Sequence, residues 1–113
     1  MAKVEITQKL KEEIFRKFKG ESGKILDLMY SLKDNPRKGK FVGQVAGVVI
    51  KELKYKSFRF YFITNGYQLR ILDAEHLKGL LVKFVMMSDK KSQQKVIDEI
   101  KNILKAFRDK SFN

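Results

Sequence analysis

Hydrophobic residues change from a helical spacing to a strand spacing near the middle of this chain. In the first third, apolar residues recur every three or four positions over Gln8–Lys19 and again from Ile25 to Leu32, which predicts two amphipathic helices joined by a short turn. Thr7 and Ser22 stand where they would cap the first and the second helix. Residues 34–36, Asp-Asn-Pro, end the second helix, because a residue before proline avoids helical geometry.

Strand-like stretches occupy most of the remaining chain before a last helix. One short strand precedes the helices and four follow them, and their predicted ranges are Val4–Thr7, Val48–Tyr55, Phe58–Thr64, Tyr67–Leu72 and Leu80–Met87. Asn65-Gly66 favours a two-residue hairpin turn, because both positions tolerate positive φ. Residues 88–92 then cap a helix with one apolar stripe, formed by Val96, Ile97, Ile100, Ile103, Leu104 and Phe107.

This order of elements predicts one α+β domain over residues 1–113. It consists of an N-terminal strand and helical hairpin, a twisted antiparallel sheet, and a C-terminal helix packed on the sheet. Residues 37–40, Arg-Lys-Gly-Lys, are expected to form a basic loop between the helical hairpin and the sheet.

The net charge of the chain indicates which kinds of binding partner are suited to it. The 113 residues carry 25 lysines and arginines against 13 acidic residues, a formal net charge of +12. A domain this basic is suited to nucleic acid, an anionic membrane surface or an acidic protein. A solvated, lysine-rich surface without a partner is the simpler alternative.

Other features of the composition exclude whole classes of chemistry. The chain has no cysteine, which excludes disulfides and thiolate metal sites, and one histidine, His76, which excludes histidine-pair metal motifs. We expect neither a metal nor a cofactor. No run without a charge exceeds ten residues, the length of Phe41–Ile50, which is too short to span a membrane, and no signal peptide is visible. A cytoplasmic protein without a membrane partner is therefore expected.

One predicted strand offers a concrete chemical suggestion. Alternation with period two sends Phe58, Phe60 and Phe62 to one face of the sheet and Arg59 and Tyr61 to the other. An arginine beside a tyrosine, edged by lysines, suits a polyanion that carries flat bases.

Three segments share short motifs with a known family. Residues 32–40 hold a leucine, an Asn-Pro pair and a Gly-Lys pair; residues 51–54, Lys-Glu-Leu-Lys, precede Ser-Phe-Arg-Phe-Tyr at 57–61; and residues 84–93 end in Lys-Lys-Ser-Gln. In order and position these motifs resemble the RelE/ParE superfamily of bacterial and archaeal toxins, especially its HigB-like and phage-derived members. The sequence departs from that pattern at Lys54, where many members have arginine, and in the extra segment 67–79.

The resemblance implies a translation-inhibiting toxin of a toxin–antitoxin system that cleaves mRNA without metal. The ribose 2′-hydroxyl would attack the neighbouring phosphate, which needs a proton acceptor, a group that stabilises the dianionic phosphorane and a proton donor. The candidate catalytic residues are Arg59, Lys54, Lys51 and Tyr61. The candidate phosphate-binding residues are Lys56, Arg70, Lys83, Lys90, Lys91, Arg37, Lys38 and Lys40. The implied partners are RNA, on or off the ribosome, and an acidic antitoxin protein.

Each candidate also has a purely structural interpretation. Arg59 can pair with Glu52 on the adjacent strand, the lysines can be solvated sheet-edge charges, and Tyr61 can be a half-buried sheet residue. His76 is left out of the site as a lone loop histidine. Two other functions stay open: a non-catalytic nucleic-acid-binding or gyrase-inhibiting, ParE-like module on the same fold, and an unrelated basic α+β interaction protein.

Overall fold

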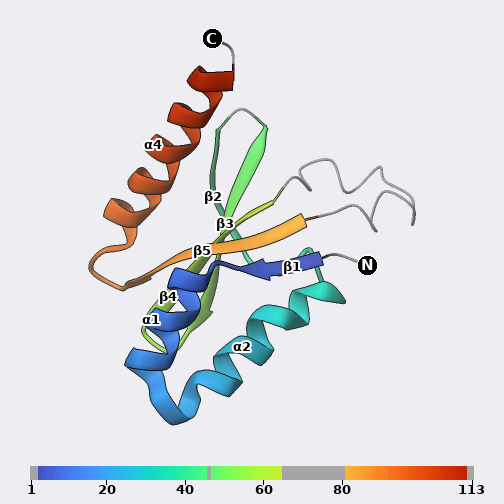
Figure 1. Ribbon diagram of the computed structural model, residues 1–113, viewed down its shortest axis with the longest axis vertical. Helices are drawn as coiled ribbons and strands as arrows, with labels where there is room; N and C mark the ends of the chain where they lie inside the picture. Colours follow the sequence, from blue (N-terminus) through green and yellow to red (C-terminus); the bar gives the residue numbers. More distant parts are fainter. Residues whose placement is uncertain (1–2, 46, 65–80, 112–113) are drawn as a thin grey trace.

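A five-stranded sheet with helices on both faces makes up the part of the protein that the structure describes (Figure 1). A computed structural model describes residues 3–45, 47–64 and 81–111. Its elements are β1 (Lys3–Ile6), α1 (Gln8–Phe18), the short 3₁₀ turn η1 (Lys19–Glu21), α2 (Ser22–Tyr30), a second such turn η2 (Ser31–Lys33), β2 (Lys40–Val45), β3 (Val48–Tyr55), β4 (Phe58–Thr64), β5 (Leu81–Asp89) and α4 (Gln93–Ser111). The predicted α+β class, helical hairpin and C-terminal helix are confirmed.

The sheet is mixed, with strand order β1-β5-β4-β3-β2. Strands β2 to β5 are antiparallel, as expected, but β1 runs parallel to β5, from the pair Lys3↔Leu81 to the pair Ile6↔Phe84. The fully antiparallel sheet was therefore a wrong prediction. The helical hairpin separates β1 from β2 along the chain, and these two strands form opposite edges of the sheet.

Strand β2 was not predicted. Residues 37–40 were expected to be a loop, but Lys40 already begins the strand and pairs with Glu52 of β3. Its register shifts between Phe41 and Gly43, which is a bulge. A glycine and a bulge in a short edge strand erase the alternation by which strands are recognised in sequence.

Helix α1 begins at Gln8 as predicted, whereas α2 begins at Ser22, the residue expected to cap it, and ends at Tyr30 instead of Leu32. Thr7 caps α1, because its Oγ1 accepts a hydrogen bond from the Leu10 amide at 3.3 Å. Ser22 does not cap α2: it is buried in the first turn and its Oγ donates to the Ile14 carbonyl at 3.1 Å. Ser22 therefore connects α2 to α1 instead of capping the N-terminus of α2.

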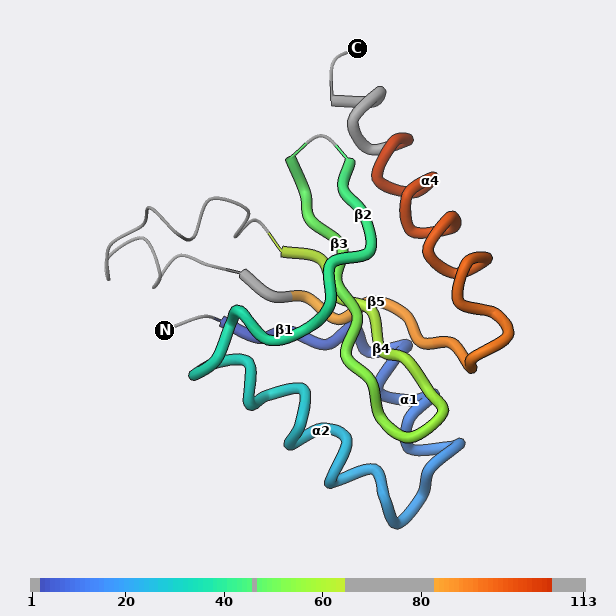
Figure 2. Tube along the Cα trace, turned by 180° about the vertical axis from the view of Figure 1, so that it is seen from behind, coloured from blue at the N-terminus to red at the C-terminus, as the bar shows by residue number. Residues whose placement is uncertain are grey.

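The alternation in β4 divides the interior into two clusters, one on each face of the sheet. Phe60 and Phe62 pack with the helical hairpin, whereas Tyr61 packs with Ile97 and Ile100 of α4. Figures 1 and 2 show the hairpin and α4 on different sides of the strands. The predicted separation of the aromatic residues is confirmed, and α4 covers part of the face that carries Arg59.

The predicted ranges of β3 and β4 match the observed strands, and β5 ends two residues later than predicted. The predicted strand 67–72, the turn at 65–66 and His76 lie outside the described residues. Within the part of the chain that is described, no helix has both the length and the apolar character needed to cross a membrane.

Candidate nucleic-acid interface

Three neighbouring strands bring basic residues together at one end of the sheet. In the register, Lys54 of β3 lies opposite Arg59 of β4, and Arg59 lies opposite Ser88 of β5. One row further along, Glu52 of β3 lies opposite Lys40 of β2. Because side chains alternate with period two, Glu52 and Lys54 share the face of Arg59.

These side chains border a hollow of about 450 Å³, which we call the Arg59 hollow. It is lined by Lys38, Gly39, Lys40, Glu52, Leu53, Lys54 and Arg59. Four cationic side chains against one carboxylate leave a local charge of +3. The lysines at 38, 40 and 54 are exposed, whereas Arg59 and Glu52 are almost fully buried. The hollow thus has an arginine at its base and lysines around its rim.

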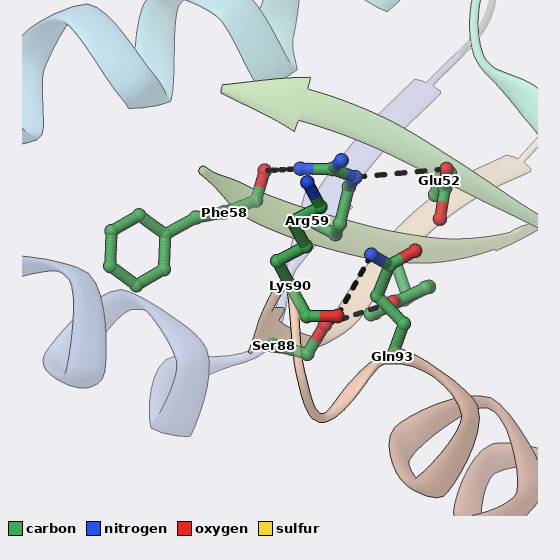
Figure 3. Close-up of polar contacts among 7 residues, drawn as sticks. Glu52, Phe58, Arg59, Ser88, Lys90 and Gln93 are labelled. Carbon is green, nitrogen blue, oxygen red and sulfur yellow. Dashed lines mark hydrogen bonds and ion pairs between the residues drawn. The ribbon is translucent and has the colours of Figure 1, made fainter. Parts of the chain in front are cut away.

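Arg59 is held from two sides (Figure 3). One of its terminal nitrogens donates to the Phe58 carbonyl at 3.3 Å, and its Nε lies 3.9 Å from Oε1 of Glu52. Only 11% of the Arg59 side chain and 10% of the Glu52 side chain are exposed. At 3.9 Å the carboxylate is an ion-pair partner and not a hydrogen-bond acceptor. Two fixed contacts orient the guanidinium while leaving N–H groups that can meet an anion in the hollow.

Tyr61 is a core residue in this structure. Its side chain is fully buried under α4, and its hydroxyl forms a hydrogen bond with Ser88 Oγ at 2.9 Å. Burial raises the pKa of the Tyr61 phenol above its ordinary value. The ring has no surface on which a base could stack, so the geometry favours the structural interpretation of this tyrosine.

Lys51 lies on the opposite face of the sheet from Arg59. It is paired in register with Phe62, its Nζ lies 6.0 Å from the centroid of that ring, and it donates to the Arg37 carbonyl at 2.9 Å. Burial lowers the pKa of the Lys51 ammonium group. The candidate catalytic pair Lys51 and Lys54 is therefore split between two faces, and Lys51 anchors the loop that carries Arg37.

Lys56 also lies away from the hollow. It occupies the turn between β3 and β4 with a φ of 53°, pairs with Glu21 of η1, and lies over the Tyr55 ring at 5.5 Å. The hydrogen bond to Glu21 raises the pKa of Lys56, and the same contact lowers the pKa of the Glu21 carboxyl. This lysine fastens the turn to the helical hairpin.

The other candidates are distributed around the molecule. Lys90 and Lys91 are exposed in the turn between β5 and α4, and Figure 3 shows Lys90 extending in the direction of Arg59. Lys83 of β5 is paired in register with Ile63 of β4, and both residues border an apolar hollow beneath α4. Arg37 is exposed on the loop before β2, and Arg70 lies outside the described residues.

Gly39 shapes the rim of the hollow, a role that the sequence prediction did not include. Its φ is +106°, and a Cβ at this position would lie 2.8 Å from Cζ of Phe62 and 3.2 Å from the Glu52 carbonyl oxygen. Only glycine fits this backbone conformation and this close approach. The signal available in sequence was the Gly-Lys pair, whose lysine is the first residue of β2.

Comparison with protein-family models, with curated proteins and with solved structures finds no match for this chain. Within the described residues, no group of three or more acidic, histidine or cysteine side chains is arranged to hold a metal ion.

Proposed function

We propose that this protein is a RelE/HigB-like toxin that binds the phosphodiester backbone of mRNA in the Arg59 hollow and thereby blocks translation. The observation that carries the proposal is the placement of Arg59 at the base of a hollow rimmed by Lys38, Lys40 and Lys54. The planar guanidinium group matches the oxygens of a phosphate, and the surrounding lysines can contact neighbouring phosphates of a single-stranded RNA.

The hollow is suited to the electrostatic part of RNA cleavage. Its fixed arginine can stabilise the charge that develops on the phosphorane, since a donor held in place before the reaction costs no reorganisation. Lys54, the register partner of Arg59, is the remaining candidate for proton transfer, because Lys51 lies on the other face and Tyr61 is buried. We assign phosphate binding to Arg59 and proton transfer to Lys54.

The direct test is in vitro translation of a reporter mRNA with purified protein, followed by mapping of mRNA ends. Wild-type protein should stop translation and leave discrete new ends. Arg59→Ala should reduce cleavage about 100-fold or more, the effect of removing one donor that stabilises a transition state. Lys56→Ala, which removes the same charge away from the hollow, should cleave like wild type. Equal cleavage by wild type and Arg59→Ala would refute the assignment.

A second candidate function is a non-catalytic RNA-binding or DNA-binding module. The burial of Tyr61 and the position of Lys51 favour it, since they remove two of the four candidate catalytic side chains from the hollow. In that case translation stops in the same assay while the reporter mRNA stays intact. Either function is compatible with an acidic antitoxin segment that covers the hollow by charge complementarity.

A further inference from the structure

A second depression lies next to the Arg59 hollow and differs from it in charge. It encloses about 520 Å³ between α1, the end of β5 and the start of α4. Figures 1 and 2 both place α1 and the start of α4 on either side of the end of β5. We call it the helix cleft. Its volume is in the range of sites that take small organic groups, roughly 300–1,000 Å³.

The helix cleft is lined by both apolar and charged side chains, and its charges balance. Phe58, Met87 and Val96 supply apolar surface, and the ammonium group of Lys17 lies 5.0 Å from the centroid of the Phe58 ring. Three carboxylates and three cationic side chains line the walls: Glu13, Asp89 and Glu99 with Arg16, Lys17 and Lys95. In a chain of net charge +12, this balance sets the cleft apart from the surrounding surface.

Two of the three carboxylates are available for a ligand. Asp89 already accepts a hydrogen bond from the Ser92 amide at 2.8 Å, which lowers the pKa of its carboxyl. Glu13 on α1 and Glu99 on α4 have no hydrogen-bond or ion-pair partner within the described part of the chain. Each helix thus contributes one free carboxylate to the walls of the cleft.

The helix cleft and the Arg59 hollow are joined through two pairs of residues. Phe58 borders the cleft and its carbonyl accepts a hydrogen bond from Arg59. Ser88, which also borders the cleft, is the register partner of Arg59. The two depressions therefore adjoin at residues 58–59 of β4 and at Ser88 of β5.

We propose that the helix cleft is a nucleobase subsite that prefers guanine, an inference that rests on the proposed binding of RNA at the Arg59 hollow. Phosphates are repelled by free carboxylates, whereas a base is uncharged, flat and apolar on its faces. The Watson–Crick edge of guanine offers two adjacent N–H donors, which match the two oxygens of a carboxylate, and a carbonyl oxygen that a neighbouring lysine or arginine can bind. Uracil offers a single N–H donor between two carbonyl oxygens, so a carboxylate disfavours it.

The test compares two labelled oligonucleotides, a uridine dodecamer and the same strand with one central guanosine, bound to the full chain at fixed salt. A good contact to a base edge corresponds to about tenfold in affinity, and we expect wild type to prefer the guanosine strand by about that factor. The double variant Glu13→Gln/Glu99→Gln should bring this ratio to about 1. The ratio corrects for the charge that the substitutions remove. Glu12→Gln, next to Glu13 but not lining the cleft, should keep the wild-type ratio.

Free guanosine separates a failure of this inference from a failure of the proposed function. It carries no phosphate, so NMR shifts of the Val96 and Met87 methyl groups during its titration report on the cleft without the hollow. Shifts with guanosine and none with uridine support the subsite even if neither oligonucleotide binds, which would refute RNA binding at the hollow instead. Oligonucleotides that bind equally, together with no guanosine shifts, overturn the subsite while leaving the proposed function intact.

Discussion

Glu52 and Arg59 lie on neighbouring strands with their charged atoms 3.9 Å apart, and both side chains are almost entirely buried. Glu52→Ala would leave the guanidinium without its counter-charge in this setting. We expect it to lower the free energy of unfolding by about 2–3 kcal/mol, the range for orphaning a buried charged group. Urea unfolding measures the change, with the exposed Glu12→Ala as control, expected within about 0.5 kcal/mol of wild type. If the two variants have the same free energy of unfolding, the Glu52 carboxylate does not stabilise Arg59.

Lys54 and Lys56 are two residues apart, yet only Lys54 lines the Arg59 hollow. Lys54→Ala should weaken RNA binding and reduce the slope of log affinity against log salt concentration by about 1, because one phosphate contact is lost. Lys56→Ala should leave that slope unchanged. Fluorescence anisotropy at a series of salt concentrations gives both slopes. Equal slopes for the two variants would show that net charge matters and the hollow does not.

Gly39→Ala should damage both the fold and the rim of the hollow. At a φ of +106° the new methyl group would meet the Phe62 ring and the Glu52 carbonyl oxygen. We expect a loss of about 2–4 kcal/mol in thermal unfolding, together with weaker RNA binding as Lys38 and Lys40 move. Gly23→Ala is the matched control, because no atom lies within 4 Å of its added Cβ. That control should be neutral or more stable by up to about 1 kcal/mol.

Tyr61→Phe separates a core tyrosine from a catalytic one. The substitution keeps the ring but removes the hydrogen bond to Ser88, which should cost about 1–2 kcal/mol of stability. RNA affinity and the rate of mRNA cleavage should stay within about twofold of wild type at a temperature where both proteins are folded, since a fully buried phenol cannot reach RNA. A large loss of cleavage with unchanged affinity would return Tyr61 to the site.

The Glu21–Lys56 pair should make stability depend on pH in a defined window. The pKa of Glu21 is lowered from 4.5 and that of Lys56 is raised from 10.5 by their mutual contact. The stabilisation is therefore fully present between these two values. It is lost as pH falls through the folded pKa of Glu21 and as pH rises through that of Lys56. Chemical unfolding at a series of pH values should show wild type more stable than Glu21→Gln at pH 7, with the difference shrinking as the solution is acidified below the ordinary pKa of a glutamate.

Much of the fold could be predicted because the signals are local. Helical spacing located α1, and alternation located β3 and β4 to the residue. Strand β2 was missed because Gly43 and a bulge remove its alternation. The parallel pairing of β1 with β5 depends on contacts between residues far apart in the chain, which no local pattern records.

The candidate site was predicted less well than the fold. The alternation of side chains along a strand correctly placed Arg59 and Tyr61 on one face of the sheet. It does not reveal that α4 covers Tyr61 and leaves Arg59 beside a hollow. The same periodicity should have separated Lys51 from Lys54, since residues three apart on a strand point to opposite faces. Lys38 and Lys40 reach the hollow through the turn at Gly39, whose positive φ becomes apparent only in three dimensions.

Binding of the phosphodiester backbone at the Arg59 hollow is tested most directly by NMR of the isotope-labelled protein during titration with a uridine oligonucleotide. The Arg59 Nε–Hε signal and the amides of residues 38–40 and 54 should shift together and saturate with one affinity, while the amides of Lys51 and Lys56 change little. A titration in which the Arg59 Nε–Hε signal stays in place while signals elsewhere shift would contradict the account.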